Sequence, residues 1–124
     1  MSLIVSAFVS LADVRQTLTP QLNAEEETTL VLVQLGLGAR RMGGSILGQV
    51  LNQFGDVVPD LDNPHDLVQL VNAINQLRSE KKILSYHDRS DGGLLAAVCE
   101  MAFAGQVGVA LNVDILITES DGIQ

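Results

Sequence analysis

Residues 87–105 read HDRSDGGLLAAVCEMAFAG, and they divide into a polar turn and an apolar helix. Residues 94–104 carry a single charged side chain, Glu100, so we expect a helix that is buried on most of its sides and ends at Gly105. The preceding turn, residues 87–93, crowds a histidine, an arginine, a serine and two aspartates in front of this helix. Such a turn is either a polar helix cap or a place where phosphate and metal are held.

The capping interpretation explains only part of this turn. Asp91 or Ser90 would cap the helix, and Gly92 and Gly93 would let the backbone turn in. Asp88 is then left without a role. Asp88 and Ser90 alternate along what we predict to be the end of a strand, so both side chains can point to one side. A carboxylate and a hydroxyl at the mouth of an α/β sheet suit Mg²⁺ and a phosphate oxygen, and both interpretations remain open.

The rest of the chain alternates apolar runs with glycine and proline signals. Four runs of β-branched and apolar residues predict strands, at residues 3–9, 28–35, 83–86 and 107–113. Helical spacing predicts one helix from Ser45 to Gly55 and another after Asn63, with Pro64 at its first position. Because strands and helices alternate, we predict an α/β (α+β layered) fold in which helices cover a mixed sheet.

The helix after Asn63 is predicted to be amphipathic. Its apolar stripe comprises Leu67, Leu70, Val71, Ile74 and Leu77. Arg78, near its end, suits the negative pole of the helix dipole. Residues 13–19 are predicted to form a short helical turn that Pro20 stops, and residues 56–62 to form a loop.

The length, composition, net charge and cysteine count narrow the class of protein. A length of 124 residues suits a single domain spanning 1–124, and 47% hydrophobic with 3% aromatic residues indicates a folded chain with an aliphatic core. A formal net charge of −8 argues against nucleic acid and anionic membrane surfaces as partners. The single cysteine, Cys99, excludes an internal disulfide and is expected to pack as a small hydrophobe. With no signal-like start, the chain is predicted to be cytoplasmic.

The glycine-rich turn LGLGARRMGGS, residues 35–45, fails two nucleotide-binding motifs. The dinucleotide pattern G-x-G-x-x-G needs a glycine where Arg41 stands, and the Walker A pattern needs a lysine where Gly44 stands. Gly43, Gly44 and Ser45 nevertheless precede a predicted helix, whose free N–H groups could accept an anion. The alternative is a tight turn that lets helix and sheet pack closely. Arg41 is expected to be solvated, or to meet a phosphate.

Five stretches together resemble a known family. They are IVSAF at 4–8, TLTPQL at 17–22, GLGARRMGGS at 36–45, SYHDRSDGGLL at 85–95 and EMAFAG at 100–105. They are similar to the large, single-chain phosphoribosylformylglycinamidine synthases, also called formylglycinamide ribonucleotide amidotransferases, over about residues 3–114. The core D-x-S-D-G-G-L is shared more widely, with aminoimidazole ribonucleotide synthetase and with selenophosphate and hydrogenase-maturation enzymes.

The resemblance implies an ATP-dependent ligase of de novo purine synthesis. Such an enzyme converts formylglycinamide ribonucleotide into its amidine with ammonia from glutamine. The implied cofactors are Mg²⁺ and ATP or ADP, with Asp88 as a metal ligand and Ser90 as a nucleotide contact. Gly43, Gly44 and Ser45 remain an additional candidate anion site, and no residue is assigned to catalysis.

The resemblance also implies that this chain is an incomplete, truncated C-terminal domain from the second synthetase half. Its expected partners are the remaining synthetase domains and the glutaminase domain, without which the chain should be inactive. Open sheet edges are expected to allow self-association. The alternative is a scaffold domain that packs against its pseudo-symmetric twin and has no ligand site of its own.

Overall fold

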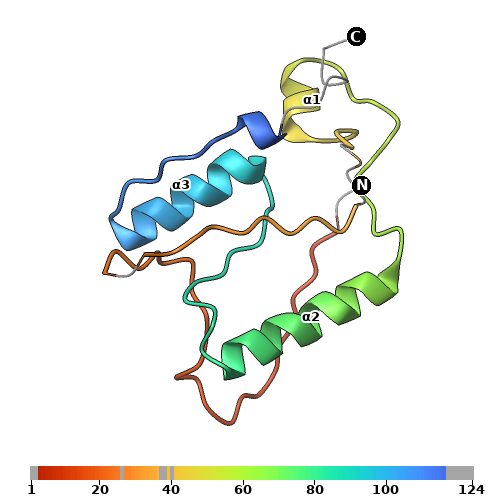
Figure 1. The fold of residues 1–124 in the computed structure, drawn as a ribbon. Coiled ribbons are helices and arrows are strands. Elements are labelled where there is room, and N and C mark those ends of the chain that lie inside the picture. Colours follow the sequence, from red (N-terminus) through yellow and green to blue (C-terminus); the bar gives the residue numbers. More distant parts are fainter. Residues whose placement is uncertain (1–2, 26, 37–38, 40, 117–124) are drawn as a thin grey trace.

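The computed structural model describes residues 3–25, 27–36, 39 and 41–116. This part of the chain contains α1 (Ile46–Val50), α2 (Pro64–Ser79), α3 (Gly93–Gly105) and the 3₁₀ helix η1 (Asp114–Leu116) (Figure 1). Within it no residue belongs to a β-strand. The predicted mixed α/β sheet is therefore wrong.

In the described part of the chain, the four segments predicted as strands do not pair with one another. Among the described residues, no backbone hydrogen bond joins residues 3–9, 28–35, 83–86 or 107–113 to another of these segments. A sheet requires such a ladder, and an apolar run without one remains an extended segment. In residues 3–9 the large apolar side chains, Leu3, Ile4, Val5, Phe8 and Val9, are at least 77% exposed. The open sheet edges from which we expected self-association are likewise not found in the described chain.

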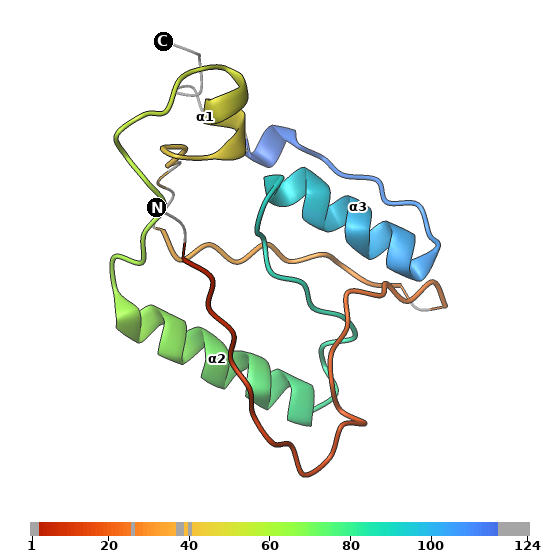
Figure 2. The ribbon, with the colours of Figure 1, turned by 180° about the vertical axis from the view of Figure 1, so that it is seen from behind.

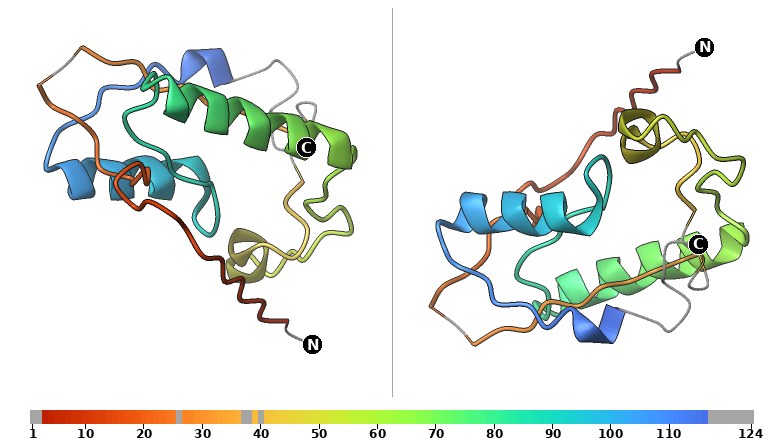
Figure 3. Two further views of the ribbon diagram at one scale, coloured as in Figure 1. Left: turned by 90° about the horizontal axis from the view of Figure 1, so that it is seen from below. Right: turned by 90° about the horizontal axis from the view of Figure 1, so that it is seen from above.

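The helices are held apart by extended chain. Figures 1 and 2 show α2 and α3 on opposite sides of extended segments, and the views from below and above in Figure 3 also separate these two helices. Across the described residues no helix contacts another. Each apolar helical face therefore depends on extended chain, or on another molecule, to cover it.

Helix α3 is buried along one narrow face. Ala97 and Met101, one turn apart, are the only buried apolar side chains in the described chain. Leu95 and Phe103 are 74% and 75% exposed. The prediction that α3 is buried on most sides is wrong, while the predicted end at Gly105 is confirmed.

Helix α2 begins where the sequence predicts. The side chain of Asn63 accepts a hydrogen bond from the His65 N–H at 3.2 Å, Pro64 occupies the first position and Arg78 lies in the last turn. No residue of α2 is buried, however, so the predicted apolar stripe has no complete cover. Upstream, a single turn is closed by the Thr17 N–H, which donates to the Val14 carbonyl at 3.1 Å, as expected for residues 13–19.

Helix α1 is shorter than predicted, because the chain reverses soon after it. The helix ends at Val50, and positive φ angles of 55° at Asn52 and 65° at Gly55 turn the backbone around. The Gly43 N–H then donates to the Val57 carbonyl at 2.8 Å. Residues 43–57 thus form a closed backbone unit around one short helix.

None of the helices in the described chain is both long enough and apolar enough to cross a membrane.

Candidate functional site

The turn before α3 is built by glycine and does not depend on a side-chain cap. Gly92 is the N-cap residue, with φ 83° in the left-handed region, and no side chain caps the helix. The Gly93 N–H donates to the Ser90 carbonyl at 3.0 Å and closes the turn through the backbone. A Cβ at Gly92 would lie 2.5 Å from the Cβ of Ala96, so both the positive φ angle and the close contact require glycine at this position. The prediction that Asp91 or Ser90 caps α3 is wrong.

The side chains of this turn consequently face outward. Ser90 and Asp91 are exposed, and Asp88 is 76% exposed. Oδ1 of the Asp88 carboxylate lies 3.5 Å from Nδ1 of His87. That distance is too long for a hydrogen bond. The lone pairs of Asp88 are therefore free to meet an external ligand.

His87 is the inner member of the turn and joins it to α3. Its side chain is 18% exposed, and its Nε2 lies 2.6 Å from Oε2 of Glu100. An ionised carboxylate can only accept, so Nε2–H donates. Glu100 is the lone charged residue of α3, and this contact gives it a partner. In the sequence, the signal for this contact is the lone charge in an apolar helix, which indicates a partner without identifying it.

The candidate anion site at the start of α1 is occupied by the protein's own backbone. The N–H groups of Gly43, Gly44 and Ser45 donate to the carbonyls of Val57, Phe54 and Met42 at 2.8, 2.7 and 3.1 Å. A Cβ at Gly43 would lie 2.6 Å from the Val57 oxygen, so close packing accounts for this glycine. Anion binding at residues 43–45 stays a prediction, and it requires residues 54–57 to move away.

Arg41 is engaged within the same region. One of its terminal nitrogens lies 2.7 Å from Oδ1 of Asp62, and the other donates to the Asp60 carbonyl at 3.0 Å. The hydrogen bond with Asp62 raises the pKa of the Arg41 guanidinium above its ordinary value. With 19% of its side chain exposed, Arg41 is a partner of the 60–62 loop, and the prediction that it is solvated is wrong.

The donor set around Asp88 supports only a partial metal site. Searched over the described residues, no group of three or more His, Cys, Asp or Glu side chains could hold a metal ion. Mg²⁺ is commonly bound through one or two carboxylates, with waters and substrate phosphates completing its octahedron. Asp88 with the Ser90 hydroxyl fits one side of such an arrangement.

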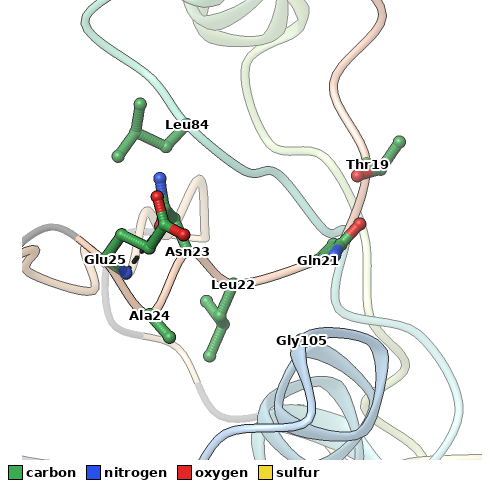
Figure 4. Close-up of a pocket in the computed structure, with 8 residues that line it drawn as sticks. All are labelled: Thr19, Gln21, Leu22, Asn23, Ala24, Glu25, Leu84 and Gly105. Carbon is green, nitrogen blue, oxygen red and sulfur yellow. Dashed lines mark hydrogen bonds between the residues drawn. The ribbon is translucent and has the colours of Figure 1, made fainter.

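A shallow depression of about 410 Å³ lies away from this turn (Figure 4). It is lined by Thr19, Gln21, Leu22, Asn23, Ala24, Glu25, Leu84 and Gly105. Figure 4 shows Leu84 on one side of the 21–25 segment and Gly105, at the end of α3, on the other side. A Cβ at Gly105 would lie 2.6 Å from the Leu22 carbonyl oxygen, so this segment crosses the helix end closely. No predicted site residue lines the depression, and the TLTPQL stretch contributes Thr19, Gln21 and Leu22 to it.

Comparison with known proteins identifies the class of domain. Residues 27–123 match the family model described as AIR synthase related protein, C-terminal domain. Domains of this class are found in ATP-using synthetases and ligases, including those of purine biosynthesis. The chain belongs to the AIR synthase related protein, C-terminal domain family. The predicted likeness is confirmed at the level of this superfamily.

Proposed function

We propose that this chain is part of a phosphoribosylformylglycinamidine synthase, in which it forms one wall of a Mg²⁺–nucleotide site. Asp88 is assigned to the metal and Ser90 to the nucleotide. The observation that carries the proposal is the outward-facing turn. Glycine and backbone bonds complete the start of α3, so capping uses neither side chain. Family membership and the HDRSDGG stretch add support.

The roles of these residues are limited to binding. The parent enzyme would use ATP to phosphorylate the amide oxygen of formylglycinamide ribonucleotide, and ammonia from glutamine would then displace the phosphate. The Asp88 carboxylate would neutralise part of the cation's charge, and the Ser90 hydroxyl would orient a phosphate oxygen. Further ligands, the glutaminase and the catalytic groups belong to partner domains of a cytoplasmic enzyme. The isolated chain is therefore expected to be inactive.

A second role, packing against other synthetase domains, is favoured by the exposed apolar surface. The five large apolar residues of segment 3–9 are at least 77% exposed, and α2 buries no side chain. The engaged N–H groups of residues 43–45 likewise favour a structural role for the glycine turn. Packing and nucleotide binding use different surfaces and are compatible.

An NMR titration of the 124-residue chain with Mg²⁺–ADP tests the nucleotide assignment. Amide shifts should cluster at residues 88–93 and should be lost in Asp88→Asn. Asp56→Asn is the matched control, because Asp56 is also an exposed carboxylate, on the 56–62 loop. It should leave the shifts unchanged. Absence of shifts at millimolar ligand, or equal shifts in Asp88→Asn, would overturn the assignment.

A further inference from the structure

We infer that His87 is a positioning residue, which ties the 88–92 turn to α3 through Glu100 and so sets the affinity of Asp88 for a divalent cation. This inference rests on the proposed metal role of Asp88. It concerns two residues to which neither the family match nor the predicted site gives a role.

The turn has few other ties. Gly92 and Gly93 both have positive φ angles, 83° and 66°, a conformation that glycine adopts readily and also leaves readily. Within the described residues, one backbone hydrogen bond, from the Gly93 N–H to the Ser90 carbonyl, closes the turn. The contact of 2.6 Å between His87 Nε2 and Glu100 Oε2 is the only side-chain bond seen there between the turn and the helix. Without it, one backbone hydrogen bond and a glycine pair are left to hold the turn that carries Asp88.

The same contact fixes which nitrogen of His87 faces Asp88. Nε2 is directed at Glu100, and the other ring nitrogen is directed at Asp88. Nδ1 lies 3.5 Å from Oδ1 of Asp88. The contact with Glu100 thus holds the residue next to Asp88 against α3. In metal sites, comparable outer residues change metal affinity by roughly 10- to 100-fold when replaced.

Variants that mimic one ring nitrogen at a time separate positioning from general stability. The amide nitrogen of His87→Gln can reach the place of Nε2, whereas that of His87→Asn reaches the place of Nδ1. Mn²⁺ in the presence of ADP is the probe, with free Mn²⁺ measured by electron paramagnetic resonance. We expect His87→Asn and Glu100→Ala to weaken Mn²⁺ binding about 10-fold, on the scale of outer-residue effects. His87→Gln should stay within about 3-fold of the original chain, and helix content by circular dichroism should be equal in all variants.

A measurement without metal tests the contact itself. A long-range ¹⁵N–¹H spectrum of the His87 ring should show the proton on Nε2, and Glu100→Ala should abolish that preference. An Nε2 without a proton, or an Nε2–H signal that is indifferent to Glu100→Ala, overturns the inference. If the original chain binds Mn²⁺ in an Asp88-dependent way but His87→Asn and Glu100→Ala bind equally well, the inference fails and the proposed function survives. If Mn²⁺ binding does not depend on Asp88, the proposed function fails and the inference with it.

Discussion

Replacing Gly43 with alanine should open the closed 43–57 unit. The added Cβ would lie 2.6 Å from the Val57 carbonyl oxygen and 2.7 Å from its carbon, and both are backbone atoms that cannot rotate away. Moving the oxygen to an ordinary contact of 3.4 Å requires about 0.8 Å. Because the new Cβ and the Gly43 nitrogen lie about 2.5 Å apart, the same movement would lengthen the 2.8 Å hydrogen bond from the Gly43 N–H to Val57 to about 3.3 Å, beyond the usual range.

The cost follows from damage to this bond at a buried position. Gly43 is buried, so weakening or losing the hydrogen bond of its N–H costs about 1–3 kcal/mol. Reduced freedom of the unfolded chain returns about 0.4–1 kcal/mol. We therefore expect Gly43→Ala to lower the free energy of unfolding by about 1 kcal/mol. At a typical slope of about 2 kcal/mol/M, the urea midpoint would fall by roughly 0.5 M.

Urea unfolding followed by circular dichroism measures this loss, and the chain contains a matched control. A Cβ at Gly108 has no atom within 4 Å, and its φ is not in the left-handed region. Gly108→Ala should therefore leave the midpoint unchanged or raise it slightly. Equal midpoints for Gly43→Ala and Gly108→Ala would refute the steric reasoning, and with it the account of why the turn contains this glycine.

Three further perturbations test the helix ends. Asn63→Ala should lower the free energy of unfolding by about 1 kcal/mol through loss of the α2 N-cap, whereas Asn63→Asp should retain the cap and the stability. Equal helix content by circular dichroism in the original chain and both variants would contradict this role of Asn63. The pKa of Glu80 is held below its ordinary value, mainly by the hydrogen bond from Lys82. The ionised Glu80 therefore stabilises the folded chain fully above the unfolded pKa of about 4.3. That stabilisation is lost as the pH falls through the lower pKa of Glu80 in the folded state. The ¹³C shift of its carboxyl group against pH should show that low midpoint, and Lys82→Met should raise it; an unmoved midpoint would argue against the pair. Gly92→Ala should destabilise α3 more than Gly93→Ala, because both residues have positive φ angles but only a Cβ at Gly92 meets a neighbouring atom. Hydrogen exchange in the first turn of α3 measures the difference, and equal exchange rates in the two variants would contradict the steric argument.

Helix ends were predictable because their signals are local. Asn63 and Pro64 are two adjacent residues that predict the start of α2, and Gly105 ends α3 where the apolar run stops. The end of α1 was missed because Asn52 adopts a positive φ that no local residue preference demands. That reversal depends on bonds to Gly43 and Gly44, which lie on the far side of the helix in sequence.

The geometry of the 87–93 turn could be predicted only in part, and the metal and nucleotide roles of Asp88 and Ser90 stay predictions. Asp88 and Ser90 are exposed, as an external ligand requires, but the expected cap from Ser90 or Asp91 is replaced by glycine geometry. The contact between His87 and Glu100 spans 13 residues and depends on how the turn meets the helix. A search for spacing motifs does not find such a pair. A lone charge on an apolar helix indicates that a partner exists without identifying it.

The strand prediction for residues 3–9 failed because an apolar pattern forms a strand only when a partner strand is available to pair with it. Residues 3–9 carry five large apolar side chains, each at least 77% exposed. Full burial of one such side chain contributes roughly 1.5–3 kcal/mol, so a partner that covered all five would gain roughly 7–15 kcal/mol before ordering costs. That gain is comparable with the whole stability of a typical domain, about 5–15 kcal/mol. The apolar pattern of residues 3–9 therefore marks a surface whose burial would be strongly favourable, and in the described part of the chain this surface is left exposed.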